Sequence, residues 1–233
     1  AECPLLMKRI FDSSHLRWET SYFIERFVEG IMNIRVKNLI ALNDEFHKLA
    51  TTVNTYLKTV IHRDFQSQNI MITKGGIPRV VDYQGARIGP PAYDVVSLLW
   101  DPYYRLEDNM REQLLDYYID KMKMSYTDQK CSAPNPPLPP LSKGGLGGFF
   151  SKGEQDRYEI ISKEFNETEF RETLLPCRLQ RHMQALGAYS FLSKIKAKKY
   201  FMKHVPEGMR LLKEDASLSK DKYPQLYNLV MGL

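Results

Sequence analysis

The sequence has little cysteine and no long apolar run, and these two shortages exclude several classes of protein. Its three cysteines, Cys3, Cys131 and Cys177, stand far apart without a Cys-x-x-Cys pair, which argues against a disulfide framework and against a zinc site. No stretch reaches the roughly 18 uninterrupted apolar residues that span a bilayer, and the N-terminus lacks the pattern of a signal peptide. We therefore expect a cytoplasmic protein that does not enter a membrane.

A large excess of charge of one sign is absent as well. The chain carries 33 Lys and Arg against 28 Asp and Glu, which gives a formal net charge of +5 over 233 residues. This excess is too small and too dispersed to indicate a nucleic-acid partner, although it suits an anionic ligand. With 43% hydrophobic and 26% charged residues, the composition is that of a globular protein with a sizeable buried core.

Helical periodicity is present on both sides of the centre of the chain. Apolar residues recur at helical spacing over residues 14–29, where Ser14 can cap the helix and Gly30 can end it, and again over residues 39–57. Later helices are expected at 93–100, 107–124, 166–191, 206–212 and 223–230. The third of these opens with a capping box at 166–169, and Pro176 should kink or restart it.

The centre of the chain has a different pattern. Two short apolar runs, at 70–72 and 80–81, are joined by Lys74-Gly75-Gly76, which predicts a small β-hairpin. The expected fold is therefore an α-rich α+β fold, with helices around a hairpin.

A Pro- and Gly-rich segment at 133–153 interrupts the helical pattern. Its composition excludes a helix or a central strand, and we expect a disordered or polyproline-like surface insertion. A proline-rich docking peptide is the alternative interpretation. The segment would separate residues 1–132, with the chemistry described next, from residues 154–233, the C-terminal helices of the same lobe.

Three polar side chains surround the predicted hairpin. Asp64 and Asn69 lie on either side of a tight loop, and Asp82 ends the second strand, so closing the hairpin should bring all three to one rim. Phosphoryl transfer from ATP needs such a set, because Mg²⁺ must neutralise the phosphate charge and the acceptor hydroxyl must lose a proton. Asn69 and Asp82 suit Mg²⁺, and Asp64 suits the role of proton acceptor.

The same residues carry a family resemblance. His62-Arg63-Asp64 with Asn69 resembles the His-Arg-Asp-x-x-x-x-Asn catalytic loop of kinases, and Asp82-Tyr83-Gln84 stands where protein kinases have Asp-Phe-Gly. The Gly-Pro-Pro-Ala-Tyr-Asp segment at 89–94 is instead similar to the aminoglycoside phosphotransferase and choline kinase superfamily. Within this superfamily, the residue sequence around 62–69 and 82–90 looks like that of the bacterial cell-wall amino-sugar kinases. Those enzymes phosphorylate N-acetylmuramate and N-acetylglucosamine at the anomeric hydroxyl in peptidoglycan recycling. The resemblance covers about residues 16–212, apart from the Pro/Gly-rich segment.

This resemblance implies a role for each matching position. Asp64 would be the catalytic base, and Asn69 and Asp82 would hold Mg²⁺ beside ATP. Asp94 would accept backbone hydrogen bonds from the catalytic loop and fix its shape, and His62 and Arg63 would support that loop. A sugar is the implied substrate, while choline, an aminoglycoside or another small alcohol is the alternative.

Other groups could contact the substrate. Gln84 and Arg87 lie just beyond Asp82 and could meet the sugar or its carboxylate, although a surface or packing role is equally compatible. Arg178, Arg181 and His182 form a basic group on a late helix, for which a solvated helix face is favoured over substrate contact. Aromatic residues could stack on a sugar, but a core cluster is the more usual arrangement: Trp100, Tyr103 and Tyr104.

Several parts of a kinase are not recognisable before His62. We find no Gly-rich cover for phosphates, no strand lysine paired with a helix glutamate and no hinge for adenine, and Gly30 is the only glycine in this region. We therefore expect that the chain lacks an N-lobe, for which a separate polypeptide is one source, and that it transfers phosphate feebly or not at all when alone. An inactive binding module is the alternative from another functional class.

Overall fold

The computed structural model describes residues 9–132 and 165–233. The Pro/Gly-rich insertion at 133–153 lies outside these residues, so its expected conformation and the division of the lobe that it implies remain predictions. Among the described residues, no helix is both long enough and apolar enough to cross a bilayer.

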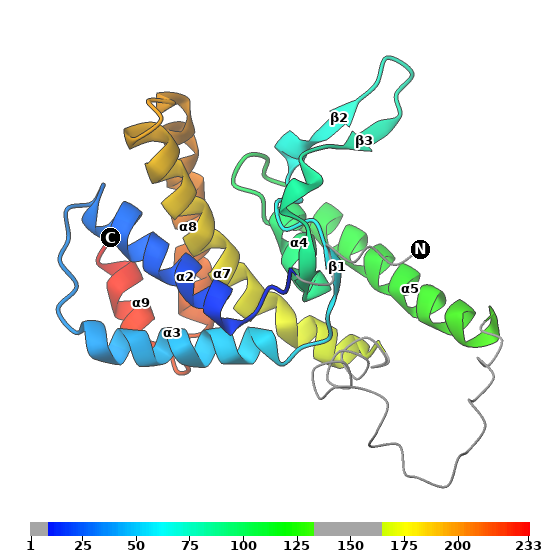
Figure 1. The fold of residues 1–233 in the computed structure, drawn as a ribbon, viewed down its shortest axis with the longest axis horizontal. Coiled ribbons are helices and arrows are strands. Elements are labelled where there is room, and N and C mark those ends of the chain that lie inside the picture. Colours follow the sequence, from blue (N-terminus) through cyan, green and yellow to red (C-terminus); the bar gives the residue numbers. More distant parts are fainter. Residues whose placement is uncertain (1–8, 133–164) are drawn as a thin grey trace, which may run out of the picture.

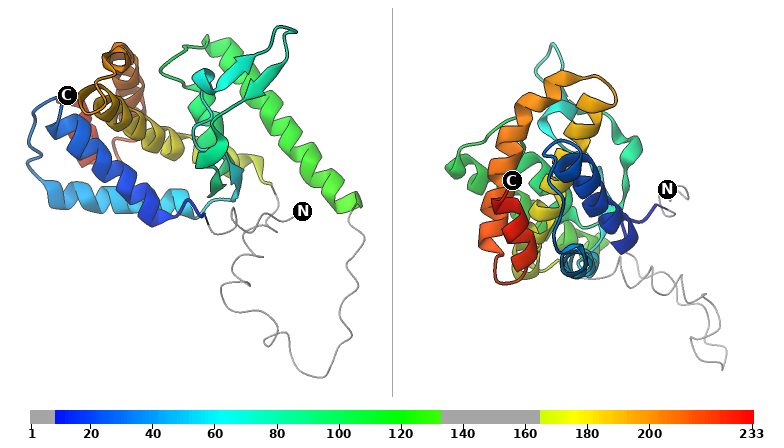
Figure 2. Two further views of the ribbon diagram at one scale, coloured as in Figure 1. Left: turned by 45° about the horizontal axis from the view of Figure 1, so that its top comes forward. Right: turned by 90° about the vertical axis from the view of Figure 1, so that its left-hand side faces the viewer.

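Helices make up most of the fold. The N-terminal helix α2 (Ser13–Phe23) continues as a π-helical turn (Ile24–Glu29), and α3 (Leu39–Asn54) follows. The long helix α7 (Glu167–Lys194) contacts α2, α3 and α4 (Pro91–Leu99) as well as α8 (Val205–Leu218), so it is the central element of the described fold. A short 3-10 helix (Lys199–His204) links α7 to α8, and α9 (Pro224–Met231) packs on α8 and α3 (Figure 2).

Two details of the predicted helices are wrong. The cap of the first helix is Asp12 rather than Ser14, because the Asp12 side chain accepts the His15 N–H at 2.9 Å. Pro176 does not restart α7, which runs unbroken through it, whereas the alternative of a kink stays a prediction. Proline removes one backbone hydrogen bond, and burial of α7 on several sides maintains the helix around that gap. The predicted cap of α7 is confirmed: the Asn166 side chain accepts the Glu169 N–H at 3.0 Å.

The strands form two small antiparallel ribbons. The predicted hairpin is confirmed as β2 (Ile70–Ile72) and β3 (Pro78–Val80), with Ile70 opposite Val80. The second ribbon pairs β1 (Thr59–Ile61) with β4 (Arg87–Gly89), and the backbone of residues 9–11 lies beside β4 through hydrogen bonds of 2.8 Å to Ile88. The predicted α-rich α+β fold is thus confirmed.

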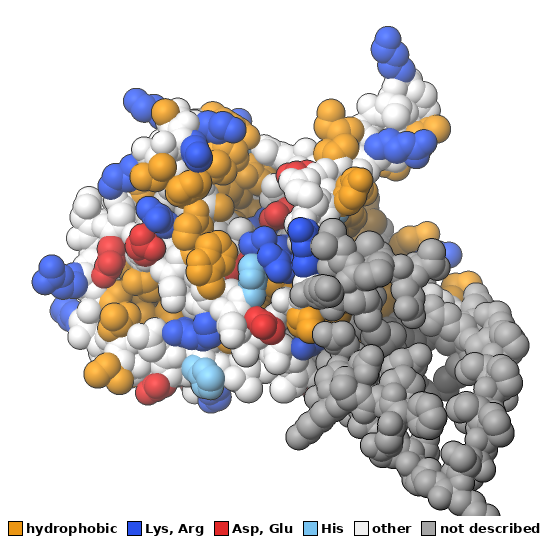
Figure 3. Space-filling view, in the orientation of Figure 1, with side chains coloured by type: hydrophobic (Ala, Val, Ile, Leu, Met, Phe, Trp, Pro, Cys, Tyr) orange, Lys and Arg blue, Asp and Glu red, His pale blue; other side chains and the backbone are white. Residues whose placement is uncertain are grey.

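The β2–β3 hairpin projects from the helical body (Figure 1) and carries exposed hydrophobic side chains (Figure 3). Met71 is 56% exposed, and Ile72 and Ile77 are at least half exposed. The core lies instead where α2, α3, α4 and α7 meet, around fully buried groups such as Phe23 and Leu186. Helix α5 (Asp108–Ser132) contacts α4 and buries Leu115 and Ile119, whereas Leu114 is 39% exposed.

Candidate active site

The loop after β1 holds Asp64 and Asn69 together. The Asn69 side-chain amide donates to the backbone carbonyl of Asp64 at 2.8 Å, and the Asn69 N–H donates to the carbonyl of Gln66 at 2.9 Å. A one-turn 3-10 helix (Ser67–Asn69) brings the chain from the loop into β2. Because the amide nitrogen of Asn69 is turned toward Asp64, its amide oxygen is the atom that remains to accept or to ligate.

Asp82 comes from the strand that pairs with the end of this loop. The Val81 N–H donates to the carbonyl of Asn69 at 3.0 Å, so Asp82 follows directly after a residue bonded to the loop. Asp82 has a left-handed backbone with φ of 68°, and this turns the chain into a short 3-10 helix (Tyr83–Gly85). That helix passes beside Asp64, since a methyl group added at Gly85 would lie 3.6 Å from the Asp64 carboxylate. The segments of Asp64, Asn69 and Asp82 are therefore neighbours.

Asp94, in the first turn of α4, makes the hydrogen bonds that the resemblance implies. Its two carboxylate oxygens accept the His62 N–H at 2.5 Å and the Arg63 N–H at 2.8 Å. Burial raises the pKa of Asp94, and these two backbone hydrogen bonds oppose that rise. The carboxylate thus shapes the loop immediately before Asp64.

Arg63 links the loop to the buried core. It has a left-handed backbone with φ of 76°, which is unusual for a long side chain, and its guanidinium lies 3.3 Å from the carboxylate of Glu19. Glu19 is fully buried and also accepts from the Tyr93 hydroxyl at 3.0 Å and from the Gln180 amide at 3.2 Å. Burial raises the pKa of Glu19, while the charge of Arg63 opposes the rise. Sequence patterns did not single out Glu19.

His62 and Gln84 contact the segment around Asp82, whereas no hydrogen bond of the described residues joins Arg87 to Asp64, Asn69 or Asp82. The His62 Nε2 lies 3.0 Å from the carbonyl of Val81, which joins the loop to the second strand of the hairpin. The exposed Gln84 side chain donates to Asp82, and the Gln84 carbonyl accepts from Arg9 at 2.8 Å. Arg87 lies in β4, where burial and the nearby Arg63 and Arg9 charges lower its pKa.

The basic group on α7 is buried, so the expected solvated face is wrong. Arg178 is 8% exposed, Arg181 4% and His182 not at all, because α7 is covered on several sides by α2, α4 and α8. The Arg181 guanidinium donates to the Gln66 side chain at 2.6 Å, so it contacts the catalytic loop rather than solvent. Its Nε donates to the Ser97 hydroxyl of α4 at 3.0 Å.

Among the aromatic residues, the core arrangement holds for Trp100. This ring is 6% exposed and lies between two guanidinium groups, Arg178 at 4.6 Å and Arg111 at 4.9 Å from the ring centroid. Tyr103 packs edge-on against the Tyr189 ring, whereas Tyr104 is 63% exposed and remains accessible.

Asp101, which sequence patterns also did not single out, contacts the same loop from the other end of α4. One of its carboxylate oxygens accepts the Ser67 N–H at 2.7 Å, and the other accepts the Tyr103 N–H at 2.9 Å. The only sequence signal for this contact was an aspartate directly after a predicted helix.

The donor set at the rim fits Mg²⁺. This cation takes oxygen ligands, keeps several waters and binds one or two carboxylates, which matches the Asn69 amide oxygen and the exposed Asp82 carboxylate. No cluster of three or more His, Cys, Asp or Glu residues able to hold a metal occurs in residues 9–132 and 165–233. A mixed amide and carboxylate site is consistent with that finding.

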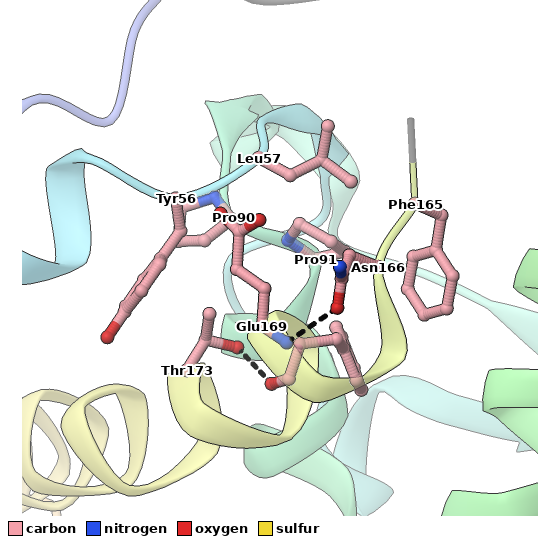
Figure 4. A pocket seen from close by; sticks show the side chains of 9 residues that line it. Tyr56, Leu57, Pro90, Pro91, Phe165, Asn166, Glu169 and Thr173 are labelled. Carbon is pink, nitrogen blue, oxygen red and sulfur yellow. Dashed lines mark hydrogen bonds between the residues drawn. The ribbon is translucent and has the colours of Figure 1, made fainter. Parts of the chain in front are cut away.

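Several cavities in the described part of the chain lie outside this rim. The small pocket in Figure 4, about 10 Å³, is formed by the chain before β1, by Pro90 and Pro91, and by the start of α7, where Asn166 bonds Glu169. It has room for about one water molecule. A larger cavity of about 540 Å³ lies between β1, α4 and α5, and His62 and Asp94 line it together with mostly apolar residues. Asp64, Asn69 and Asp82 do not line this cavity, so it is distinct from the rim.

The fold and the rim define a kinase-like phosphotransferase lobe. The sequence profile of the phosphotransferase enzyme family matches residues 4–127, just over half of the 233 residues, and the chain belongs to this family. It is also similar to the N-acetylmuramate/N-acetylglucosamine kinase of Neisseria meningitidis serogroup B, with 41% identity over 66 residues. That match covers 28% of this chain and 20% of the relative, so the chain spans far less than two thirds of the relative's length.

Proposed function

We propose that this chain transfers the γ-phosphate of ATP to a hydroxyl group of an amino sugar. The observation that carries the proposal is the joined loop and hairpin, in which Asn69 contacts Asp64 directly and Asp82 follows a residue bonded to Asn69. The sugar is supported by the 41% identity to a kinase named for N-acetylmuramate and N-acetylglucosamine.

Each residue of the rim has one task in this proposal. The Asp64 carboxylate accepts the proton of the sugar hydroxyl as that oxygen attacks the γ-phosphorus of ATP and the bond from this phosphorus to the ADP oxygen breaks. The Asn69 amide oxygen and the Asp82 carboxylate hold Mg²⁺. When bound, the cation neutralises charge on the transferring phosphoryl group.

The residues around the rim orient the reacting groups. Asp94 and the Arg63–Glu19 pair hold the backbone before Asp64, and His62 joins the loop to Val81. Gln84 and Arg87 are the proposed sugar contacts beyond Asp82. Arg181 is buried and bonded to Gln66, so we propose that it acts on the substrate through the loop rather than by direct contact.

The test is a transfer assay with labelled MgATP and a panel of N-acetylmuramate, N-acetylglucosamine, choline and an aminoglycoside. We expect only slow formation of a phosphorylated amino sugar by this chain alone, because no phosphate cover, strand lysine or adenine hinge is recognisable before His62, and Asp64→Asn should slow it further by about 10²- to 10⁴-fold. The exposed Asp44→Asn serves as the matched control and should leave the rate unchanged. Transfer to choline alone would replace the proposed substrate. No transfer to any acceptor, either by the chain alone or after its fusion to a related N-lobe, would overturn the proposed activity.

A further inference from the structure

The catalytic loop is attached to both ends of one rigid helix. Asp94, in the first turn of α4, binds the N–H groups of His62 and Arg63, and Asp101, two residues after the end of α4, binds the N–H of Ser67. The first attachment precedes Asp64, and the second opens the 3-10 turn that carries Asn69. The two reactive residues are therefore fixed through two different carboxylates.

Asp101 is itself held firmly. Its side chain is 2% exposed, and its two oxygens each accept one backbone N–H, from Ser67 at 2.7 Å and from Tyr103 at 2.9 Å. A buried carboxylate bonded in this way has little freedom to rotate, because any other orientation would leave two partly buried N–H groups without this acceptor.

A buried network from α7 and α8 fixes the residue before Asp101. The His182 Nε2 lies 3.0 Å from the carbonyl of Trp100, and its Nδ1 lies 2.6 Å from the carboxylate of Asp215 in α8. His182 and Asp215 are both fully buried, and Arg178 binds the other oxygen of Asp215 at 2.5 Å while its guanidinium packs on the Trp100 ring. Helices α7 and α8 thus fix the backbone and side chain of the residue that precedes Asp101.

We propose that Asp101 is a positioning residue that sets the place of Asn69 through the Ser67 N–H, while Asp94 sets the place of Asp64. The inference deepens the proposed function, and its consequence for metal binding rests on Asn69 being a Mg²⁺ ligand. The 3-10 turn of Ser67–Asn69 transmits the position: its first residue is bonded to Asp101, and its last residue is bonded to the carbonyls of Asp64 and Gln66. Loss of the Asp101 carboxylate should loosen this turn and leave the Asp94 attachment intact.

The first experiment is amide hydrogen exchange on Asp101→Ala and Asp94→Ala, with the exposed Asp108→Ala as control. In Asp101→Ala the Ser67 amide should exchange about tenfold faster or more, while the His62 and Arg63 amides stay protected. Asp94→Ala should give the reverse pattern. Equal acceleration of all these amides in both variants, or unchanged exchange at Ser67 in Asp101→Ala, would overturn the proposal. If Asp101→Ala does not fold, Asp101→Asn keeps the side-chain volume, and at least one of the Ser67 and Tyr103 amides must then lose protection.

The second experiment separates positioning from general destabilisation. Mn²⁺ is titrated in the presence of ATP and followed by its electron paramagnetic resonance signal. Asp101→Ala and Asn69→Ala should each weaken binding about tenfold, and the double variant should bind no more weakly than Asn69→Ala, because Asp101 acts through Asn69. Multiplied effects in the double variant would show that Asp101 acts independently of Asn69 and would sink the inference. A wild-type chain that binds no Mn²⁺ would count against the proposed function, and the exchange experiment would still decide the positioning role.

Discussion

The two halves of the candidate site are held in opposite ways. The loop with Asp64 and Asn69 is attached by the partly buried Asp94, by the buried Asp101 and by the Arg63–Glu19 pair. Asp82, in contrast, is exposed, and the next residue, Tyr83, is 73% exposed. The loop is therefore preorganised by the core, as a proton acceptor requires, whereas the proposed metal carboxylate stands at the surface. Substitutions in the loop half should therefore change mainly the free energy of unfolding, and substitutions at Asp82 should change mainly the affinity for the metal.

The buried half should give the largest effect on stability. Glu19→Ala leaves the Arg63 guanidinium without its buried partner and removes the acceptor of the Tyr93 hydroxyl, so we expect a loss of about 3–5 kcal/mol in the free energy of unfolding. Glu19→Gln keeps the shape and should cost less. Urea unfolding measures both, with the exposed Glu29→Ala as control. A loss below about 0.5 kcal/mol for Glu19→Ala would show that the pair does not brace the loop.

The β1–β4 ribbon, which leads into the loop of Asp64, is tightly packed, so we expect the next largest loss of stability there. A methyl group at Gly89 would lie 2.7 Å from the Ile61 side chain and 3.0 Å from Phe11, so Gly89→Ala should cost about 1–3 kcal/mol. Gly75→Ala, in the hairpin turn, is the matched control because no atom lies within 4 Å of the added carbon. Similar melting temperatures for the two variants would contradict the contrast between a packed ribbon and an open hairpin.

Sequence patterns selected the candidate reactive residues of both halves better than the residues that support them. Asp64, Asn69 and Asp82 could be selected because a hairpin and fixed spacings are local features of the chain, and Asp94 could be placed through the family resemblance. Glu19 and Asp101 act across long sequence separations, on partners that no local pattern connects. The prediction of a solvated face for the basic group of α7 was wrong for the same reason. The residue pattern along one helix does not reveal that α2, α4 and α8 cover it.

The fold shows the same division. Helices with a clear apolar stripe and a cap, such as α3 and α7, were predicted nearly to their ends. The ribbon of β1 and β4 was not predicted as a pair, because strands of three residues are too short to show alternation and their partners are distant in sequence.

His15 lies at the edge of the buried half and should give a pH-dependent effect. Burial, followed by the charges of Arg63 and Arg87, lowers its pKa to about 4, while Asp12 opposes this shift. Glu19 also faces the ring, at 3.8 Å. Between pH 6.5 and 4 the unfolded chain takes up a proton that the folded chain does not, so stability should fall as the pH falls through this window.

Comparison of His15→Gln with the parent chain isolates this effect. The variant should lose about 1–2 kcal/mol of the pH dependence between pH 6.5 and 4, a value that allows for solvent around the partly exposed ring. Unfolding is measured in urea at both pH values, with the exposed His47→Gln as control. Parallel pH profiles for His15→Gln and the parent would mean that the His15 pKa is not lowered in the fold.

The exposed half should give the smallest effect on stability. In Asp82→Asn the side chain can still accept from Gln84, and asparagine tolerates the left-handed backbone at this position, so the free energy of unfolding should change by less than about 0.5 kcal/mol. Mn²⁺ binding in the presence of ATP should nevertheless weaken about tenfold or more, since a neutral amide replaces the proposed carboxylate ligand. Asp44→Asn, another exposed aspartate, should change neither quantity. Unfolding and Mn²⁺ titration on the same samples decide the matter: a stability loss above about 2 kcal/mol would make Asp82 part of the braced half, and unchanged Mn²⁺ affinity would remove it from the metal site.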